Sequence, residues 1–264
     1  MNFTNKVVWI TGASSGIGKA LAIELSNQGA KLILSARNKD KLIEVKNFCN
    51  NSEPIEVLCL DLEDHASLHI KAKEAIKLFG RIDILINNGG ISQRSLASET
   101  TLVVDKRIMD INYLGTVALS KAVLPHFIKN NSGQFVVTTS IVGKIGTPLR
   151  SSYAASKHAL HGFFDSLRAE NHKHNIAVTI ICPGFVRTNV SINALTGNGS
   201  PQNTMDLATQ NGIKPDRFAR IMSKAIYNNK EEVYIAGTKE KLGVYVKRFF
   251  PKLLSKMIRK LSVT

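Results

Sequence analysis

The stretch Val7-Val-Trp-Ile-Thr-Gly-Ala-Ser-Ser-Gly-Ile-Gly18 decides the fold of this chain. Its four leading apolar residues predict a buried strand, and apolar residues at helical spacing from Ala20 to Leu25 predict a helix that ends at Gly29. Glycines between a strand and a helix let the backbone approach a pyrophosphate, and the N-terminus of the helix offers it free N–H groups. The stretch therefore predicts the first half of a βαβ unit with a dinucleotide-binding turn.

A P-loop is the alternative interpretation of this turn, because Gly18 and Lys19 close it. The glycine spacing differs from that motif, and Ala20 stands where a P-loop carries the Ser or Thr that binds Mg²⁺. A strand before the glycines and a helix after them are the context that a dinucleotide turn requires. We therefore favour the dinucleotide turn.

The rest of the chain alternates between strand and helix patterns. Further strands are expected at 31–37, 55–60, 82–86, 135–140, 176–182 and 232–236, and further helices at 39–50, 67–79, 101–129, 153–170 and 215–226. This alternation predicts an α/β doubly wound fold, in which helices cover both faces of a parallel sheet of about seven strands. We expect one domain at 1–238 and an extension at 239–264. Asn112 and Gly115 predict a kink in the helix at 101–129.

Tyr153 and Lys157 are four residues apart, so their side chains share one face of the expected helix. A neighbouring ammonium favours the phenolate and lowers the pKa of a phenol from its usual value of about 10. Ser140 ends the preceding strand, so its hydroxyl and the phenol can converge on one carbonyl. The alternative is an ordinary solvated Tyr–Lys pair.

The second strand ends in Ala36 and Arg37, where sites that prefer NAD carry an acid for the ribose 2′-OH. A guanidinium at this point suits a 2′-phosphate, which favours NADP over NAD. The alternative is an ordinary solvated arginine. Asp61 and the Asn-Asn-Gly-Gly run at 87–90 also follow strands, and spacing alone fits ligand binding and turn chemistry equally.

Composition limits the class of protein. The chain has 264 residues, of which 44% are apolar, enough for one substantial core. Three cysteines, with no signal-peptide layout and no apolar run of bilayer length, predict a soluble cytoplasmic protein. The histidine pairs 65/69, 158/161 and 172/174 have no acidic partner at metal-ligand spacing, so we expect no metal site.

The C-terminal extension carries much of the net charge of +15, because residues 239–264 hold eight basic residues and one acid. Apolar residues are expected on one helical stripe, with Pro251 breaking or kinking it: Leu242, Val246, Phe249, Phe250, Leu253, Met257 and Leu261. Three interpretations stay open: packing on the body or a second subunit, peripheral contact with an anionic membrane, and nucleic-acid binding without sequence preference.

With these motifs assembled, residues 6–237 resemble the short-chain dehydrogenase/reductase family of Rossmann-type, NAD(P)-dependent oxidoreductases. The resemblance rests on ordered motifs: the turn at 11–18, Asp61, the run at 87–90, Asn112, Ser140, Tyr153-Ala-Ala-Ser-Lys157, Pro183-Gly184 and Thr188. Gly89 departs from the Ala usual in the family. The branch that the chain resembles acts on steroids and retinol, and its members often associate with membranes.

The resemblance implies a catalytic role for four residues. Tyr153 is expected as general acid in reduction and general base in oxidation. Lys157 is expected to hold the nicotinamide ribose and to lower the tyrosine pKa. Ser140 is expected to bind the substrate oxygen, and Asn112 to steady a water that links Lys157 to solvent.

It also implies an NADP site, with the 2′-phosphate near Ser14, Ser15 and Arg37. The expected contacts are Gly12, Ser14, Ser15, Gly16, Ile17, Gly18, Arg37, Asp61, Leu62, Asn88, Gly89, Gly90, Tyr153, Lys157, Pro183, Gly184, Val186 and Thr188. A homodimer or homotetramer through the helices at 101–129 and 153–170 is implied as well.

We therefore expect an NADP(H)-dependent oxidoreductase that interconverts a carbonyl and an alcohol on a small-molecule substrate. Residues 189–212, rich in Asn, Gly, Thr and Ser, are expected to form a mobile lid, and residues 92–99 and 143–150 to shape the pocket. The alternative is a non-catalytic NADP-binding sensor or scaffold that docks through its basic tail. The complete set of four catalytic residues argues against that alternative.

Overall fold

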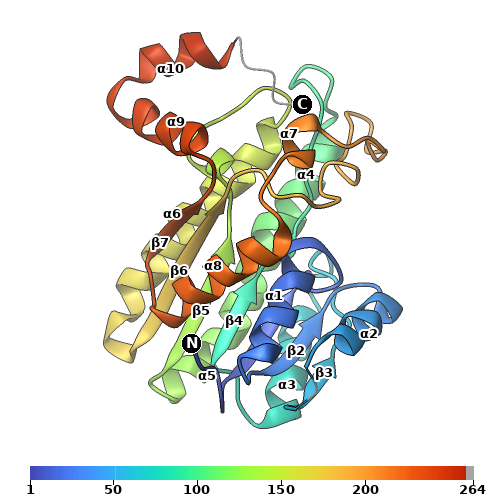
Figure 1. The fold of residues 1–264 in the computed structure, drawn as a ribbon, viewed down its shortest axis with the longest axis vertical. Coiled ribbons are helices and arrows are strands. Elements are labelled where there is room, and N and C mark those ends of the chain that lie inside the picture. The colour runs from blue at the N-terminus through green and yellow to red at the C-terminus, as the bar shows by residue number, and fades with distance from the viewer. Residues whose placement is uncertain (51, 260–264) are drawn as a thin grey trace.

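Strand β1 (Val7–Thr11) lies at the centre of a parallel sheet, between β2 (Lys31–Ser35) and β4 (Ile84–Asn87). In the computed structural model, which describes residues 1–50 and 52–259, the strand order is β3-β2-β1-β4-β5-β6-β7 (Figure 1). The other strands are β3 (Ile55–Val57), β5 (Gly133–Thr138), β6 (Ile176–Pro183) and β7 (Glu232–Ile235). The predicted doubly wound Rossmann-type fold is confirmed. The order reverses between β1 and β4, which opens a crevice at their carboxyl ends.

Helices cover both faces of the sheet. Alternate residues of β1 point to opposite faces, so Trp9 packs in one core and Ile10 in the other. The Trp9 core contains residues of α3 (Leu68–Phe79), α5 (Thr116–Lys129) and α6 (Ser151–Asn171). The Ile10 core contains residues of α1 (Gly16–Asn27), α2 (Lys39–Phe48) and α8 (Pro215–Tyr227). Strands buried on both sides explain the nearly continuous apolar runs in the sequence.

The predicted kink near Asn112 is a π-helix. Helix α4 (Leu102–Met109) passes into η1 (Asp110–Gly115), which continues as α5. The side chain of Asn112 binds the backbone of Ile91, and a Cβ on Gly115 would lie 2.2 Å from the carbonyl oxygen of Leu62. Asn112 and Gly115 both lie in the π-helix, a type of turn that is frequent at functional sites.

The tail differs from the single stripe that we expected. Only Phe250 lies between α9 (Thr238–Phe249) and α10 (Pro251–Ile258), because the proline that begins α10 cannot continue the first helix (Figure 1). The break turns most of the stripe outward: Leu242, Phe249, Phe250, Leu253 and Met257 are exposed. Leu254, outside the stripe, packs in the core instead. Lys260 and Leu261 lie outside the described residues.

Residues 189–212, the expected lid, are joined by backbone hydrogen bonds to the loop after β4. The backbone of Leu195 pairs with that of Ser92 and Arg94, at 2.8 Å in each case. The segment ends in the short helix α7 (Leu207–Gln210), whose N-cap Asp206 is buried. Short 3-10 helices occur at Ile141–Gly143 (η2) and His172–His174 (η3). No helix in the described part of the chain is long and apolar enough to cross a membrane.

Candidate active site

Two cavities meet at the carboxyl edge of the sheet. The first, of about 610 Å³, is lined by the glycine turn, the ends of β2, β4 and β5, and Tyr153. The second, of about 400 Å³, lies between the end of β6 and helices α9 and α10. Both are lined by Ser140, Tyr153 and Gly184, so the predicted catalytic hydroxyls form the wall that the cavities share.

The glycine turn forms one end of the larger cavity. Gly12 and Gly16 have φ values of +64° and +55°, which L side chains rarely adopt, and a Cβ on Gly12 would lie 2.8 Å from Gly89 Cα. Ser14 and Ser15 line the cavity together with Gly16 and Ile17, the first two residues of α1. Gly18 does not line it, contrary to the prediction, because its α-carbon packs against the Gly12 carbonyl, where a Cβ would lie 2.2 Å from the oxygen.

Two cations lie at the rim beyond the turn. Arg37 is exposed and lines the cavity together with Ser14 and Ser15, where the sequence placed it. Lys41, in the first turn of α2, lines the same rim and was not predicted. The signal for Lys41 was available, since it lies in the first turn of the helix expected directly after Arg37.

The remaining predicted cofactor residues also line this cavity. They are Ile17, Asp61, Leu62, Asn88, Gly89, Gly90, Pro183, Gly184, Val186 and Thr188. The amide nitrogen of Asn88 donates to the backbone oxygens of Thr11 (3.2 Å) and Gly12 (3.3 Å). Asn88 therefore joins the end of β4 to the glycine turn and holds its shape.

Lys157 lies beneath the larger cavity with its side chain buried. Its Nζ donates to the carbonyl oxygen of Thr138, at 2.9 Å, and lies 5.7 Å from the centroid of the Tyr153 ring. Burial disfavours the charged form and lowers the pKa of Lys157 to about 8. At about pH 8, therefore, half of the protein molecules carry a neutral Lys157 amine.

The electrostatics of Tyr153 differ from the prediction. Burial raises the pKa of Tyr153 above its ordinary value, while a hydrogen bond with Ser140 and the charges of Arg94 and Arg150 act in the opposite direction. The expectation that Lys157 lowers this pKa is wrong for the protein alone, because Lys157 directs its ammonium at Thr138 and is itself desolvated. The cations that favour the phenolate come from elsewhere in the chain.

Asn112 is fully buried behind Lys157. Its Oδ1 accepts from the N–H of Ile91 (2.8 Å), and its Nδ2 donates to the oxygens of Ile91 (2.9 Å) and Ser156 (3.1 Å). Asn112 therefore shapes the turn after β4 from within the π-helix. Its contact with a water stays a prediction.

Comparisons with known proteins agree with this geometry. The family model described as "short chain dehydrogenase" matches residues 6–198. The chain belongs to the short-chain dehydrogenase family. It is 42% identical over 254 residues to "Dehydrogenase/reductase SDR family member 7B" of Xenopus laevis, covering 94% of this chain and 79% of that protein. It is 43% identical over 254 residues to "Dehydrogenase/reductase SDR family member 7" of Homo sapiens, covering 94% of this chain and 75% of that one.

Among solved structures, levodione reductase matches this short-chain dehydrogenase with a TM-score of 0.82 at 27% identity, over 91% of this chain and 99% of that one. The chain is thus an oxidoreductase of the NAD(P)-dependent kind. Its larger cavity fits such a cofactor on physical grounds, because side chains at Gly12 and Gly16 would be strained and would close the space beside a helix N-terminus.

The smaller cavity of this short-chain dehydrogenase is mostly apolar beyond Ser140 and Tyr153. Its walls include Ile145 from the predicted pocket region at 143–150. They also include residues that sequence reasoning did not assign to a pocket: Ile141, Val142, Phe185, Leu242, Val246, Leu254 and Met257. Glu240 fixes this wall, because its Oε1 accepts from the N–H of Phe185 at 2.9 Å. No sequence signal showed that the tail would cover the pocket.

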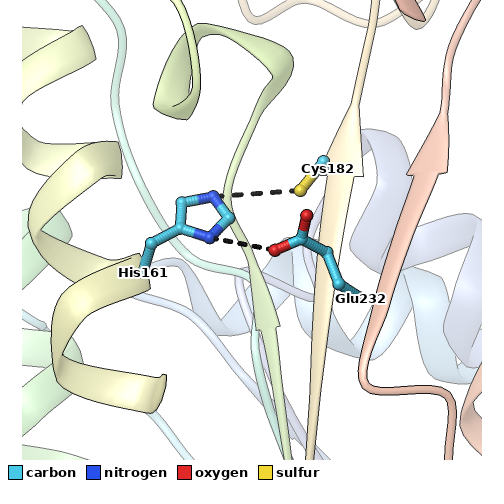
Figure 2. Close-up of side chains that lie close together, drawn as sticks. All are labelled: His161, Cys182 and Glu232. Carbon is cyan, nitrogen blue, oxygen red and sulfur yellow. Dashed lines mark hydrogen bonds and ion pairs between the residues drawn. The ribbon is translucent and has the colours of Figure 1, made fainter. Parts of the chain in front are cut away.

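Sequence reasoning also missed a polar cluster formed by side chains of α6, β6 and β7. Figure 2 shows His161 between Cys182 and Glu232, with Nε2 3.8 Å from the thiol sulfur and Nδ1 3.5 Å from the carboxylate. Burial opposes the charge of Glu232, but hydrogen bonds from His161, Lys144 and Tyr234 outweigh it and lower its pKa to about 2. Burial raises the pKa of Cys182 to about 12. Because the two ring nitrogens face different partners and an ammonium already pairs with Glu232, we interpret this cluster as a structural network.

Proposed function

We propose that this chain is an NADP(H)-dependent oxidoreductase that interconverts a carbonyl and an alcohol, with Tyr153 as general acid and base. One observation carries the proposal: Ser140 and Tyr153 form the wall between the cavity with the glycine turn and the apolar cavity. A substrate oxygen at that wall is within reach of both hydroxyls, while its carbon faces the larger cavity. When bound there, NADP(H) supplies or accepts the hydride.

Residues of the chain itself supply and accept the proton that is exchanged with the substrate oxygen. In reduction, Tyr153 donates its hydroxyl proton to the substrate oxygen as that oxygen gains negative charge, and in oxidation it accepts the proton back. Ser140 also donates a hydrogen bond to that oxygen, since its own contact with the Pro183 carbonyl is long, at 3.5 Å. Lys157 orients the ribose through its ammonium, which has three donors.

The preference for NADP rests on Arg37 and Lys41. Both line the rim of the larger cavity near Ser14 and Ser15, where a 2′-phosphate would lie. Two cations attract a dianionic phosphate, and Ala36 and Arg37 stand directly after β2, where sites that prefer NAD carry a carboxylate for the ribose 2′-OH.

The substrate class follows from the smaller cavity. Apolar side chains from η2, α9 and α10 surround it, and its volume of about 400 Å³ falls within the range of small-molecule sites. We therefore propose an apolar ketone, aldehyde or alcohol, with steroids and retinoids as the first candidates to test.

The decisive experiment compares Tyr153→Phe with Tyr245→Phe, an exposed tyrosine on α9. NADPH oxidation is followed while apolar ketones, aldehydes, steroids and retinoids are screened, and the best substrate is used for both variants. We expect Tyr153→Phe to lose at least a hundredfold in kcat, the lower end for general acid–base catalysis, and Tyr245→Phe to stay near the parent value. Turnover retained in Tyr153→Phe would contradict the mechanism, and NADPH binding without turnover on any compound would favour the sensor or scaffold alternative.

We also propose that the outer face of α9 and α10 contacts an anionic membrane. Exposed Phe249 and Leu253 lie on the two helices and exposed Phe250 lies between them. The cations at 247, 248, 252 and 256 lie on the same helices, and the cation at 259 directly follows α10. The only acid of this region, Glu240, is already bound to backbone N–H groups. Bulky apolar groups beside uncompensated cations are the features that hold a helix at an anionic lipid surface.

Vesicle sedimentation tests this contact. The protein should pellet at low salt with phosphatidylcholine vesicles that contain phosphatidylserine, and much less with phosphatidylcholine alone. Replacing Phe249 and Phe250 by Ser should abolish pelleting. The matched control replaces Leu102 and Val103 on α4, which are even more exposed than the two phenylalanines, by Ser and should leave pelleting unchanged. Equal pelleting by both double variants would contradict this surface.

A further inference from the structure

The smaller cavity opens on the surface of the tail. Four of the described residues that line it are exposed and mark its mouth: Val190, Lys239, Leu242 and Met257. Leu242 is 58% exposed, Met257 46% and Val190 41%, whereas Ser140, in the wall shared with the larger cavity, is 8% exposed. Exposed apolar side chains around an opening are typical of a surface that meets an apolar partner.

Helices α9 and α10 line the cavity with some side chains and turn others to the outside. Val246 and Leu254 line the cavity, and Leu254 is buried. Phe249 and Leu253, on the same two helices, are exposed, as is Phe250 between them. The rim of the mouth and the proposed lipid contact therefore belong to the same pair of helices, which lies at one end of the molecule (Figure 1).

Helix α9 is attached to the wall of the pocket. Oε1 of Glu240 accepts from the N–H of Phe185 at 2.9 Å. A Cβ on Gly243 would lie 3.4 Å from Cδ1 of Ile145, so the backbone of the helix packs closely against Ile145. Because the helix that carries Leu242 is attached in this way, a surface that binds the tail is placed next to the mouth.

The charge around the mouth favours an anionic surface as the partner of the tail. Lys239 lies at the mouth, and further cations follow at 247, 248, 252 and 256 of the two helices. Glu240, the only acid at 239–264, is bound to the backbone N–H groups of Phe185 and Gly237. A second copy of this chain would bring the same positive charge to the contact, whereas anionic headgroups neutralise it.

We propose that the apolar cavity takes its substrate directly from the lipid phase. Docking of α9 and α10 on an anionic membrane sets the mouth against the bilayer, so that an apolar ketone, aldehyde or alcohol dissolved there reaches Ser140 and Tyr153 without crossing water. Leaving the lipid for water would expose apolar surface at a cost in free energy, which this route avoids. The inference rests on the proposed function and on the proposed membrane contact, and it adds the route of entry and a substrate class that partitions into lipid.

The first test locates the mouth relative to the lipid and needs no substrate. Trp9 is the single tryptophan of the chain and is fully buried, so quenching by brominated acyl chains reports on a tryptophan introduced at the surface. Leu242→Trp and Met257→Trp should lose fluorescence on brominated vesicles that contain phosphatidylserine. Leu78→Trp is the matched control and should keep its fluorescence, since Leu78 is 41% exposed on α3, far from α9 and α10 (Figure 1). Failure to pellet, or pelleting without quenching at Leu242 and Met257, would overturn the proposal.

The second test measures the route of entry with the best apolar substrate of the screen. Its apparent KM, per total substrate, should be about tenfold lower with phosphatidylserine-containing vesicles than with phosphatidylcholine alone, because protein on the vesicle meets the dissolved substrate at a raised effective concentration. A water-soluble carbonyl compound should show equal KM values on both kinds of vesicle.

Replacing Phe249 and Phe250 by Ser should remove the tenfold difference, and turnover without vesicles reports whether this variant is folded. Equal KM values for the apolar substrate on the two kinds of vesicle, in a parent protein that pellets, would show entry through water and overturn the proposal. Absence of turnover on any compound would count against the proposed function, and the quenching at Leu242 and Met257 would still decide whether the mouth meets the lipid.

Discussion

Binding of NADPH should be accompanied by proton uptake at Lys157. The side chain is 4% exposed, and burial lowers its pKa to about 8, against an ordinary value of 10.5. If the ribose hydroxyls require the ammonium form, the bound state keeps the proton across this range while the free protein loses it. At pH 8, half of the free protein has a neutral Lys157, so binding should take up about half a proton.

Because binding is coupled to protonation of Lys157, the affinity for NADPH should depend on pH. Below about pH 7 the Lys157 amine is protonated before binding, so the affinity for NADPH should not change with pH. Each pH unit above 8 should then weaken binding about tenfold, or about 1.4 kcal/mol, because an increasing fraction of the protein must be protonated first. The sign follows from the lowered pKa of the free protein: rising pH produces the neutral form, which binds more weakly.

Calorimetric titration of NADPH in two buffers of different ionisation enthalpy measures this uptake between pH 6 and 9.5. Lys157→Met should bind more weakly and take up almost no proton at pH 8. Lys144→Met is the matched control, because its ammonium pairs with Glu232 under β7, away from the coenzyme cavity. Uptake near zero in the parent protein, or equal uptake in Lys157→Met, would refute the reasoning.

Two further predictions concern Arg37 at the rim of the coenzyme cavity and Gly18 in the glycine turn. Arg37→Asp should lower the ratio of NADPH to NADH affinity at least tenfold, because a carboxylate repels the 2′-phosphate and binds a free 2′-OH; equal ratios in fluorescence titrations would discard Arg37 as the phosphate contact. Gly18→Ala should lower the free energy of unfolding by about 2 kcal/mol, since its Cβ would lie 2.2 Å from the Gly12 oxygen. Gly162→Ala in α6, with no atom within 4 Å, should raise that free energy by about 1 kcal/mol, and urea unfolding that ranks the two variants the other way would contradict this.

Much of the architecture and of the cofactor cavity could be predicted from sequence because their signals are local. A strand followed by glycines and a helix is a contiguous pattern, and strand–helix alternation leaves few topologies for the sheet. Tyr153 and Lys157 share a helix, so their proximity follows from their spacing. The signal for the π-helix is also local, since Asn112 and Gly115 are both unfavourable inside an α-helix.

The sequence by itself determined the sheet, the turn and most of the residues that face the coenzyme cavity. Only the tertiary structure decided which charges surround Tyr153, because Arg94 and Asp206 are 112 residues apart and no period or turn rule links them. It also decided that the tail covers the pocket, and that His161 meets Glu232. Each of these depends on how elements pack against one another, and a pKa depends on the burial and charges that this packing creates.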